Sequence, residues 1–208
     1  MTEGAGRDRI RVCLVDDHGM IREALKARFA REPDIEVVGE AATARSAVTL
    51  VSSVRPDVAV LDVQLPDGDG VTICREIRSA VPGTACLMLT GYSGDQALVG
   101  AIMAGAAGYV SKENIAGKLV TAVRNVAAGR SALDPGAAQK VMGMLREELA
   151  TGPRLSSRDK LVLELIGDGL TDRQIAQRLD EPVEAAKGEV LSLLAKLGLP
   201  GVPAAGHG

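Results

Sequence analysis

Short apolar runs alternate with amphipathic segments through residues 10–128. Runs without polar alternation are typical of strands buried on both faces of a sheet, and apolar residues spaced three and four apart are typical of helices. The expected strands are 10–15, 35–41, 58–62, 85–89 and 108–110, and the expected helices are 18–31, 44–54, 71–80, 95–104 and 114–128. This alternation over short loops predicts an α/β fold with one doubly wound, five-stranded parallel sheet.

Glycine and proline divide the rest of the chain. Breakers between residues 129 and 135 end the α/β body, helical spacing follows over 136–149, and the chain breaks again at 151–153. We therefore predict an α/β domain over 1–130, a linker helix over 131–154 and a small all-α domain over 155–199. The composition of residues 200–208 predicts a disordered tail.

Three short helical patterns fill the predicted all-α domain. Ser156 or Ser157 caps the first, and Thr171 with Gln174 opens the second as a capping box. Pro182 suits the first helical position of the third, which runs over 183–197. Two short helices joined by a tight turn predict a helix-turn-helix, although purely structural helix pairs share this pattern.

Composition narrows the class of protein. The chain of 208 residues has 46% hydrophobic but only 1% aromatic residues, which gives little surface for stacking on nucleic-acid bases. Cys13, Cys74 and Cys86 are far apart in apolar surroundings, so we expect reduced core residues. There is neither a basic leader followed by an apolar stretch nor an apolar run of about eighteen residues, which predicts a cytoplasmic protein without a membrane partner.

Polar residues follow the expected strands where each one ends. They are Asp16 and Asp17, Asp62, Thr90 and Lys112. The C-terminal ends of parallel strands converge, so we expect these residues at one rim, where three carboxylates repel one another unless a cation joins them. Mg²⁺ prefers such oxygen ligands, while a lysine and a hydroxyl can contact phosphoryl oxygens. The rim predicts a phosphoryl group on Asp62; the alternative is a set of solvated loop acids.

Four motifs contain the rim residues: Asp-Asp-His after the first strand, Leu-Asp-Val-Gln-Leu-Pro-Asp-Gly around Asp62, Leu-Thr at Thr90, and Gly-Ala-Ala-Gly-Tyr-Val-Ser-Lys ending at Lys112. They resemble the receiver domain of two-component response regulators, which implies a flavodoxin-like fold. The C-terminal runs Leu-Ser-Ser-Arg-Asp, Gly-Leu-Thr-Asp-Arg-Gln-Ile-Ala and Leu-Leu-Ala-Lys-Leu-Gly resemble the LuxR-type helix-turn-helix of the NarL/FixJ subfamily. Within that subfamily, Arg-Pro-Asp-Val-Ala-Val-Leu-Asp-Val and Ala-Gly-Arg-Ser resemble the actinobacterial dormancy regulators DosR/DevR.

The resemblance implies a role for each rim residue. Asp62 would accept phosphate from a phosphohistidine of a sensor histidine kinase. Asp17, Asp62 and the Gln64 carbonyl would bind Mg²⁺ directly, and Asp16 would bind it through water. Phosphorylation would then release the helix-turn-helix or join it into a homodimer.

Thr90 and Tyr109 match the switch pair of the family. In that pair the hydroxyl moves to the phosphoryl group and the aromatic ring turns inward. The alternative for Tyr109 is ordinary half-buried packing.

The predicted third helix of the all-α domain departs from the family pattern. Where relatives read close to Thr-Val-Lys-x-His-Val, residues 185–190 read Ala-Ala-Lys-Gly-Glu-Val, and Glu184 and Glu189 would face the phosphate backbone of DNA. From residue 154 onward seven basic residues stand against eight acidic ones, whereas DNA-binding modules are normally positive. The fourth helix of the family is missing, so the domain is degenerate. The candidate DNA contacts are Lys187 and Arg173.

Two functions remain open at this level. The first is a response regulator that controls transcription through its helix-turn-helix. The alternative is a receiver-driven regulator whose degenerate output domain does not bind DNA and acts by protein contact. We expect no enzyme, because Gln64, two positions after Asp62, offers no carboxylate for acid-base catalysis.

Overall fold

A parallel sheet of five strands in the order β2-β1-β3-β6-β7 forms the centre of the protein. The computed structural model describes residues 9–91, 95–133, 143 and 155–197. The strands are β1 (Ile10–Val15), β2 (Ile35–Ala41), β3 (Val58–Asp62), β6 (Ala85–Thr90) and β7 (Gly108–Ser111). The predicted parallel sheet is confirmed, and β6 and β7 are each one residue longer than expected.

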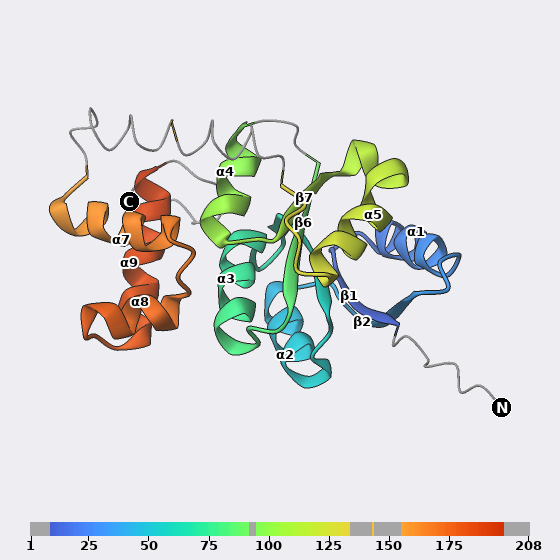
Figure 1. Ribbon diagram of the computed structural model, residues 1–208, viewed down its shortest axis with the longest axis horizontal. Coiled ribbons are helices and arrows are strands. Elements are labelled where there is room, and N and C mark those ends of the chain that lie inside the picture. Colours follow the sequence, from blue (N-terminus) through green and yellow to red (C-terminus); the bar gives the residue numbers. More distant parts are fainter. Residues whose placement is uncertain (1–8, 92–94, 134–142, 144–154, 198–208) are drawn as a thin grey trace.

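Helices cover both faces of the sheet (Figure 1). Apolar side chains of α2, α3 and α4 pack on one face, and those of α1 and α5 pack on the other. The helices are α1 (Gly19–Phe29), α2 (Ala44–Val54), α3 (Gly70–Ala80), α4 (Asp95–Ala104) and α5 (Ile115–Ala127). This is the doubly wound arrangement that the sequence predicts. Within the described ranges no helix has both the length and the apolar character needed to cross a membrane.

Side chains of each strand alternate between the two apolar layers. Val12 and Leu14 of β1 join the layer of α1 and α5, while Cys13 and Val15 join the layer of α2, α3 and α4. Every residue of β3 is buried, which explains why its sequence is an unbroken apolar run up to Asp62. All three cysteines are free thiols in the core, as expected.

The segment after β3 is more regular than the loop expected from its proline and glycines. The strands β4 (Gln64–Leu65) and β5 (Gly68–Asp69) pair as a short antiparallel hairpin. At Gly70, a Cβ atom would overlap the carbonyl oxygen of Asp62. Only glycine lets α3 begin so close to the end of β3, so this contact fixes the start of α3 beside Asp62.

Local contacts set the helix ends. His18 is the N-cap of α1 rather than its first residue. A single 3₁₀ turn (Lys112–Asn114) precedes α5. Arg55 ends α2 in the left-handed conformation with φ 45°, directly before Pro56, where the sequence predicts the stop.

A three-helix domain (residues 155–197) follows and consists of α7 (Ser157–Gly167), α8 (Asp172–Leu179) and α9 (Val183–Lys196). Its first cap is Ser156, which decides between the two serines that the sequence allows. Thr171 and Gln174 form the predicted capping box of α8, whereas Pro182 is the N-cap of α9 rather than its first helical residue. Most of the predicted linker helix over 131–154 lies outside the described residues, as does the tail over 200–208.

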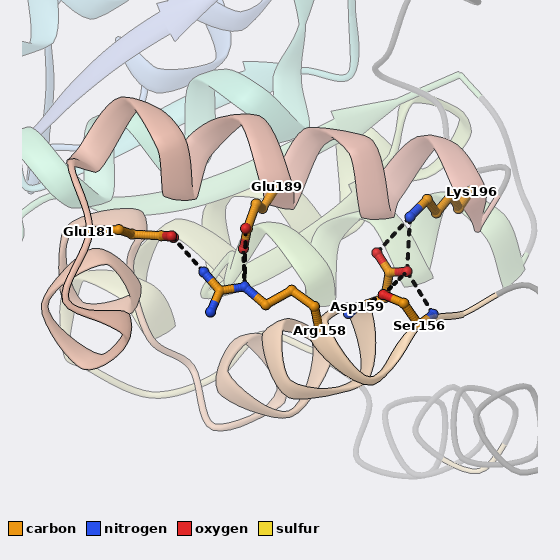
Figure 2. Close-up of polar contacts among 6 residues, drawn as sticks. All are labelled: Ser156, Arg158, Asp159, Glu181, Glu189 and Lys196. Carbon is orange, nitrogen blue, oxygen red and sulfur yellow. Dashed lines mark hydrogen bonds and ion pairs between the residues drawn. The ribbon is translucent and has the colours of Figure 1, made fainter.

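Asp159 joins the first and third helices of this domain (Figure 2). Its carboxylate accepts hydrogen bonds from the Ser156 N–H at 2.8 Å and the Ser156 Oγ at 2.7 Å, and it pairs with Lys196 Nζ at 2.8 Å. The hydrogen bond from Lys196, helped by those from Ser156, lowers the pKa of Asp159 to about 2. Since Lys196 is the last residue of α9, this cluster fixes the end of α9 against the start of α7.

Acidification should loosen this cluster. An unfolded aspartate titrates near pH 3.9 on average, roughly two units above Asp159 in the fold, so the unfolded state binds more protons between these values. The stability from Asp159 should be complete above about pH 5 and be lost as the pH falls from about 4 to about 2. Asp159→Asn should abolish this pH dependence. At neutral pH it should also raise the exchange of α7 and α9 amides about 5-fold.

Hydrogen exchange of the whole chain, corrected for the intrinsic effect of pH, measures both results. Glu164→Gln on the exposed side of α7 is the matched control. Exchange in Asp159→Asn that equals the wild type at every pH would contradict the stabilising role of Asp159.

Candidate functional site

Charged side chains from three strand ends meet at one edge of the sheet. Asp62 ends β3, Asp16 follows β1 and Lys112 follows β7. Lys112 Nζ lies 2.7 Å from Asp16 Oδ2 and 2.7 Å from Asp62 Oδ2. The parallel topology brings them together although Asp62 and Lys112 are 50 positions apart in the sequence.

Asp17 and His18 complete this cluster. One ligand atom from each of Asp16, Asp17, His18 and Asp62 can be chosen so that all lie within 4.8 Å of one another. His18 Nδ1 lies 2.7 Å from Asp17 Oδ1 and 3.2 Å from Asp16 Oδ1. Sequence reasoning gave His18 no role, and the available signal was its place directly after the two aspartates.

Burial and hydrogen bonds shift the pKa values of the charged groups in the cluster. Asp16 and Asp62 are only 1% and 4% exposed. Burial raises the pKa of Asp62, the hydrogen bond from Lys112 acts against this, and the neighbouring Asp16 raises it further. Burial lowers the pKa of Lys112, but hydrogen bonds to Asp16 and Asp62 outweigh it and leave the pKa raised. Lys112 therefore stays protonated among carboxylates that repel one another. Binding of a further cation would reduce that repulsion.

The donor set fits a hard divalent cation. Three carboxylates with converging oxygens supply more negative charge than Lys112 balances, and Mg²⁺ prefers oxygen ligands of this kind. Gln64 adjoins the cluster, because its N–H donates to Asp62 Oδ1 at 3.3 Å.

Thr90 and Tyr109 lie on neighbouring strands beside the cluster. Thr90 is buried at the end of β6, opposite Ser111, while Tyr109 is half-buried opposite Met88. Since side chains two positions apart share a face, Thr90 and Tyr109 point to the same side of the sheet. Burial raises the pKa of Tyr109.

The two candidate DNA contacts both lie toward the α/β domain. Lys187 Nζ pairs with Glu76 Oε1 of α3 at 2.9 Å. Arg173 lines a cavity of about 760 Å³ between the α/β domain and the three-helix domain, together with Arg78 and Gly83. In this arrangement Lys187 is paired within the molecule, whereas Arg173 is exposed beside this cavity.

The acidic residues of the third helix have different surroundings (Figure 2). Arg158 of α7 donates to Glu189 through Nε at 2.9 Å and to Glu181 through Nη2 at 2.5 Å. Packing of α9 on α7 therefore gives Glu189 an internal partner, Arg158, which offsets part of the repulsion that the sequence predicts between this carboxylate and a phosphate backbone. The side chain of Glu184, in contrast, is 86% exposed.

Comparison with known proteins places these features in a family. The response regulator receiver domain matches residues 12–124. The chain is 44% identical over 193 residues to the DNA-binding transcriptional activator DevR/DosR of Mycobacterium tuberculosis, with 91% of this chain and 89% of that protein covered. That relative is named as a regulator of transcription rather than as an enzyme.

Solved structures show the same likeness. A LuxR-family two-component response regulator from Aurantimonas sp. SI85-9A1 is 36% identical with a TM-score of 0.60, covering 66% of this chain and 98% of that chain. The RcsB response regulator of Salmonella typhimurium is 21% identical with a TM-score of 0.59, covering 92% of this chain and 94% of that chain, and shows the two-domain fold alone.

The receiver match spans the sheet with its cluster of carboxylates, and the relative from Mycobacterium tuberculosis extends over both domains. The resemblance inferred from the sequence motifs is thus confirmed. The chain belongs to the response regulators, in their LuxR/NarL family.

Proposed function

We propose that Asp62 accepts a phosphoryl group from a phosphohistidine of a sensor histidine kinase, and that this event controls DNA binding by the three-helix domain. The observation that carries the proposal is the Lys112 ammonium, which bridges two buried carboxylates at 2.7 Å. Solvated loop acids, the alternative interpretation, would be exposed, whereas Asp16 and Asp62 are buried.

The transfer forms one bond and breaks another. A carboxylate oxygen of Asp62 attacks phosphorus, the phosphorus–nitrogen bond breaks, and the imidazole leaves with the electron pair. Lys112 Nζ, already within hydrogen-bond distance of Asp62, would donate to a phosphoryl oxygen. Asp16, Asp17, Asp62 and the Gln64 carbonyl would hold Mg²⁺, which when bound neutralises charge on the phosphoryl oxygens.

Thr90 and Tyr109 are proposed as the switch pair. Their positions on adjacent strands and on the same side of the sheet support this role. The Thr90 hydroxyl would turn to a phosphoryl oxygen, and the space that it leaves would accept the Tyr109 ring.

DNA binding by the three-helix domain is proposed from the relative that is named a DNA-binding transcriptional activator. The arrangement described here is closed, because Lys187 is paired with Glu76 and Arg173 lines the cavity between the domains. Release of the three-helix domain would free Lys187 from Glu76 and open the surface around Arg173. A homodimer would double the number of phosphate contacts. Such a regulator acts on the chromosome, so we place it in the cytoplasm. We assign it no catalytic turnover of its own.

A second candidate is an output domain that acts by protein contact without DNA. It is favoured by Gly188 in the middle of α9 and by the exposed Glu184 one turn before it. Glu184 would repel phosphate, and glycine weakens a helix by about 1 kcal/mol relative to alanine. DNA affinity after phosphorylation separates the two candidates.

Asp62→Asn should abolish labelling by acetyl phosphate in the presence of Mg²⁺, because the amide is not a nucleophile. The label on the wild type should be labile to hydroxylamine, as an acyl phosphate is. Intact-mass spectrometry measures both. Asp180→Asn is the matched control, since asparagine tolerates the left-handed backbone at that position, with φ 55°. An acid-stable label that persists in Asp62→Asn would refute the receiver chemistry.

Lys112→Ala should retain Mg²⁺, because the carboxylates remain, but should uncouple phosphorylation from oligomer size. Its ammonium contacts both Asp16 and Asp62, so it can stay bonded to Asp16 while it donates to a phosphoryl oxygen on Asp62. Size-exclusion chromatography with light scattering, with and without acetyl phosphate, measures the coupling. Lys118→Ala, at an exposed position of α5, is the control. If Lys112→Ala changes size on phosphorylation as the wild type does, Lys112 has no part in the switch.

The closed, unphosphorylated chain should bind duplex DNA no better than roughly 10⁻⁵ M, within the range of non-specific binding. Glu184→Lys should raise the affinity of the phosphorylated protein and steepen its salt dependence by about one unit per new phosphate contact. Fluorescence anisotropy at several salt concentrations measures both values. Glu164→Lys on α7 makes the same charge change elsewhere and should have a smaller effect. A nanomolar, sequence-specific footprint by the unphosphorylated wild type would rule out the closed state as described.

A further inference from the structure

Two arginines of α3 hold the three-helix domain. Arg75 Nε donates to Asp172 Oδ1 at 2.7 Å, and Arg78 Nη2 donates to the Gly169 carbonyl oxygen at 3.0 Å. The side chains of Arg75 and Asp172 are only 3% and 4% exposed. A buried charge needs its partner, so this ion pair remains favourable only while the domains are docked.

The C-terminal end of α4 lies against the same arginines. The last four carbonyl groups of a helix have no partner within the helix. At the end of α4, the Ala106 N–H donates to the Ala101 carbonyl oxygen at 2.9 Å, and the Gly105 N–H donates to the Ile102 carbonyl oxygen at 2.8 Å. Gly105 has φ 67°, so these two bonds form a Schellman motif that satisfies two of the four carbonyls.

The arginines take the two remaining carbonyls. Arg75 Nη1 donates to the Met103 oxygen at 2.6 Å, and Arg78 Nη1 donates to the Ala104 oxygen at 3.4 Å. A side chain at Gly105 would overlap the Arg78 guanidinium, so glycine also makes room for this contact. Each guanidinium therefore donates to α4 through one nitrogen and to the three-helix domain through another.

The other end of α4 lies toward the phosphorylation site. The helix begins five residues after Thr90, the last residue of β6. Its ten residues span about 15 Å. Because a helix moves as a rigid element, a displacement at its start reaches the carbonyls of Met103 and Ala104.

We propose that Arg75 and Arg78 form a clamp that couples the end of α4 to the docking of the three-helix domain. While the domain is docked, Asp172 holds the Arg75 guanidinium where it also caps α4. When the domain leaves, Arg75 loses its counter-ion and becomes exposed to water, and the cap on α4 loosens with it. Since coupling is reciprocal, a shift of α4 that withdraws the Met103 carbonyl weakens docking by the same factor. The clamp deepens the proposed function, on which its link to phosphorylation rests.

The decisive variant is Asp172→Asn, measured without phosphate and without DNA. Hydrogen exchange of the whole chain should show the Gly105 and Ala106 amides exchanging at least about 5-fold faster than in the wild type. These amides donate to carbonyls at the C-terminal end of α4, so a purely local effect on the start of α8 does not alter them. Arg75→Lys should act in the same direction, since an ammonium keeps the charge but lacks the forked geometry needed for both partners.

Arg45→Gln removes one positive charge from an exposed position of α2 and should leave both amides unchanged. Unchanged exchange of Gly105 and Ala106 in Asp172→Asn and in Arg75→Lys would overturn the clamp, whether or not α8 exchanges faster. Failure of acetyl phosphate to label Asp62 would instead overturn the proposed function, and it would leave this comparison of unphosphorylated chains intact.

Discussion

Repulsion among carboxylates at the end of a buried sheet is the constraint on which the rest of the protein depends. Asp16 and Asp62 are buried side by side because two adjacent parallel strands end at the same level. Lys112 balances part of their charge from a third strand. Such a site is stable only while the strand order and register keep these atoms in place, so the whole sheet serves to position a few polar side chains.

Helix α3 connects this site to the three-helix domain. Its first residue, Gly70, lies against the backbone of Asp62, and its later turns carry Arg75, Glu76 and Arg78 toward the second domain. Helix α4, which starts after the neighbouring strand, ends on the same two arginines. The cluster of Asp16, Asp62 and Lys112 and the domain interface are thus linked by two short, packed helices rather than by a long chain of contacts.

Internal ion pairs change how the charges of the three-helix domain should be interpreted. Arg158, Lys187 and Lys196 each have a carboxylate partner within the protein. These pairs neutralise acidic residues that would repel DNA, but they also occupy cations that would attract it. The pairs within the domain would persist after release, whereas the pair of Lys187 with Glu76 would not. Release of the three-helix domain, as proposed, would therefore change the exposed charge of α9 by freeing Lys187.

The succession of strands and helices along the chain, the cap at Thr171 and the polar residues at the strand ends were all predictable from the sequence, because these signals depend on neighbours a few positions away. The sequence also identified Asp62, Asp16 and Lys112 as one site, since parallel topology makes strand ends converge. Only the tertiary structure turned Glu189 toward Arg158, joined Lys187 to Glu76, and placed Arg75 between Met103 and Asp172. These contacts depend on how helices far apart in the chain pack together, and helical periodicity does not encode that packing.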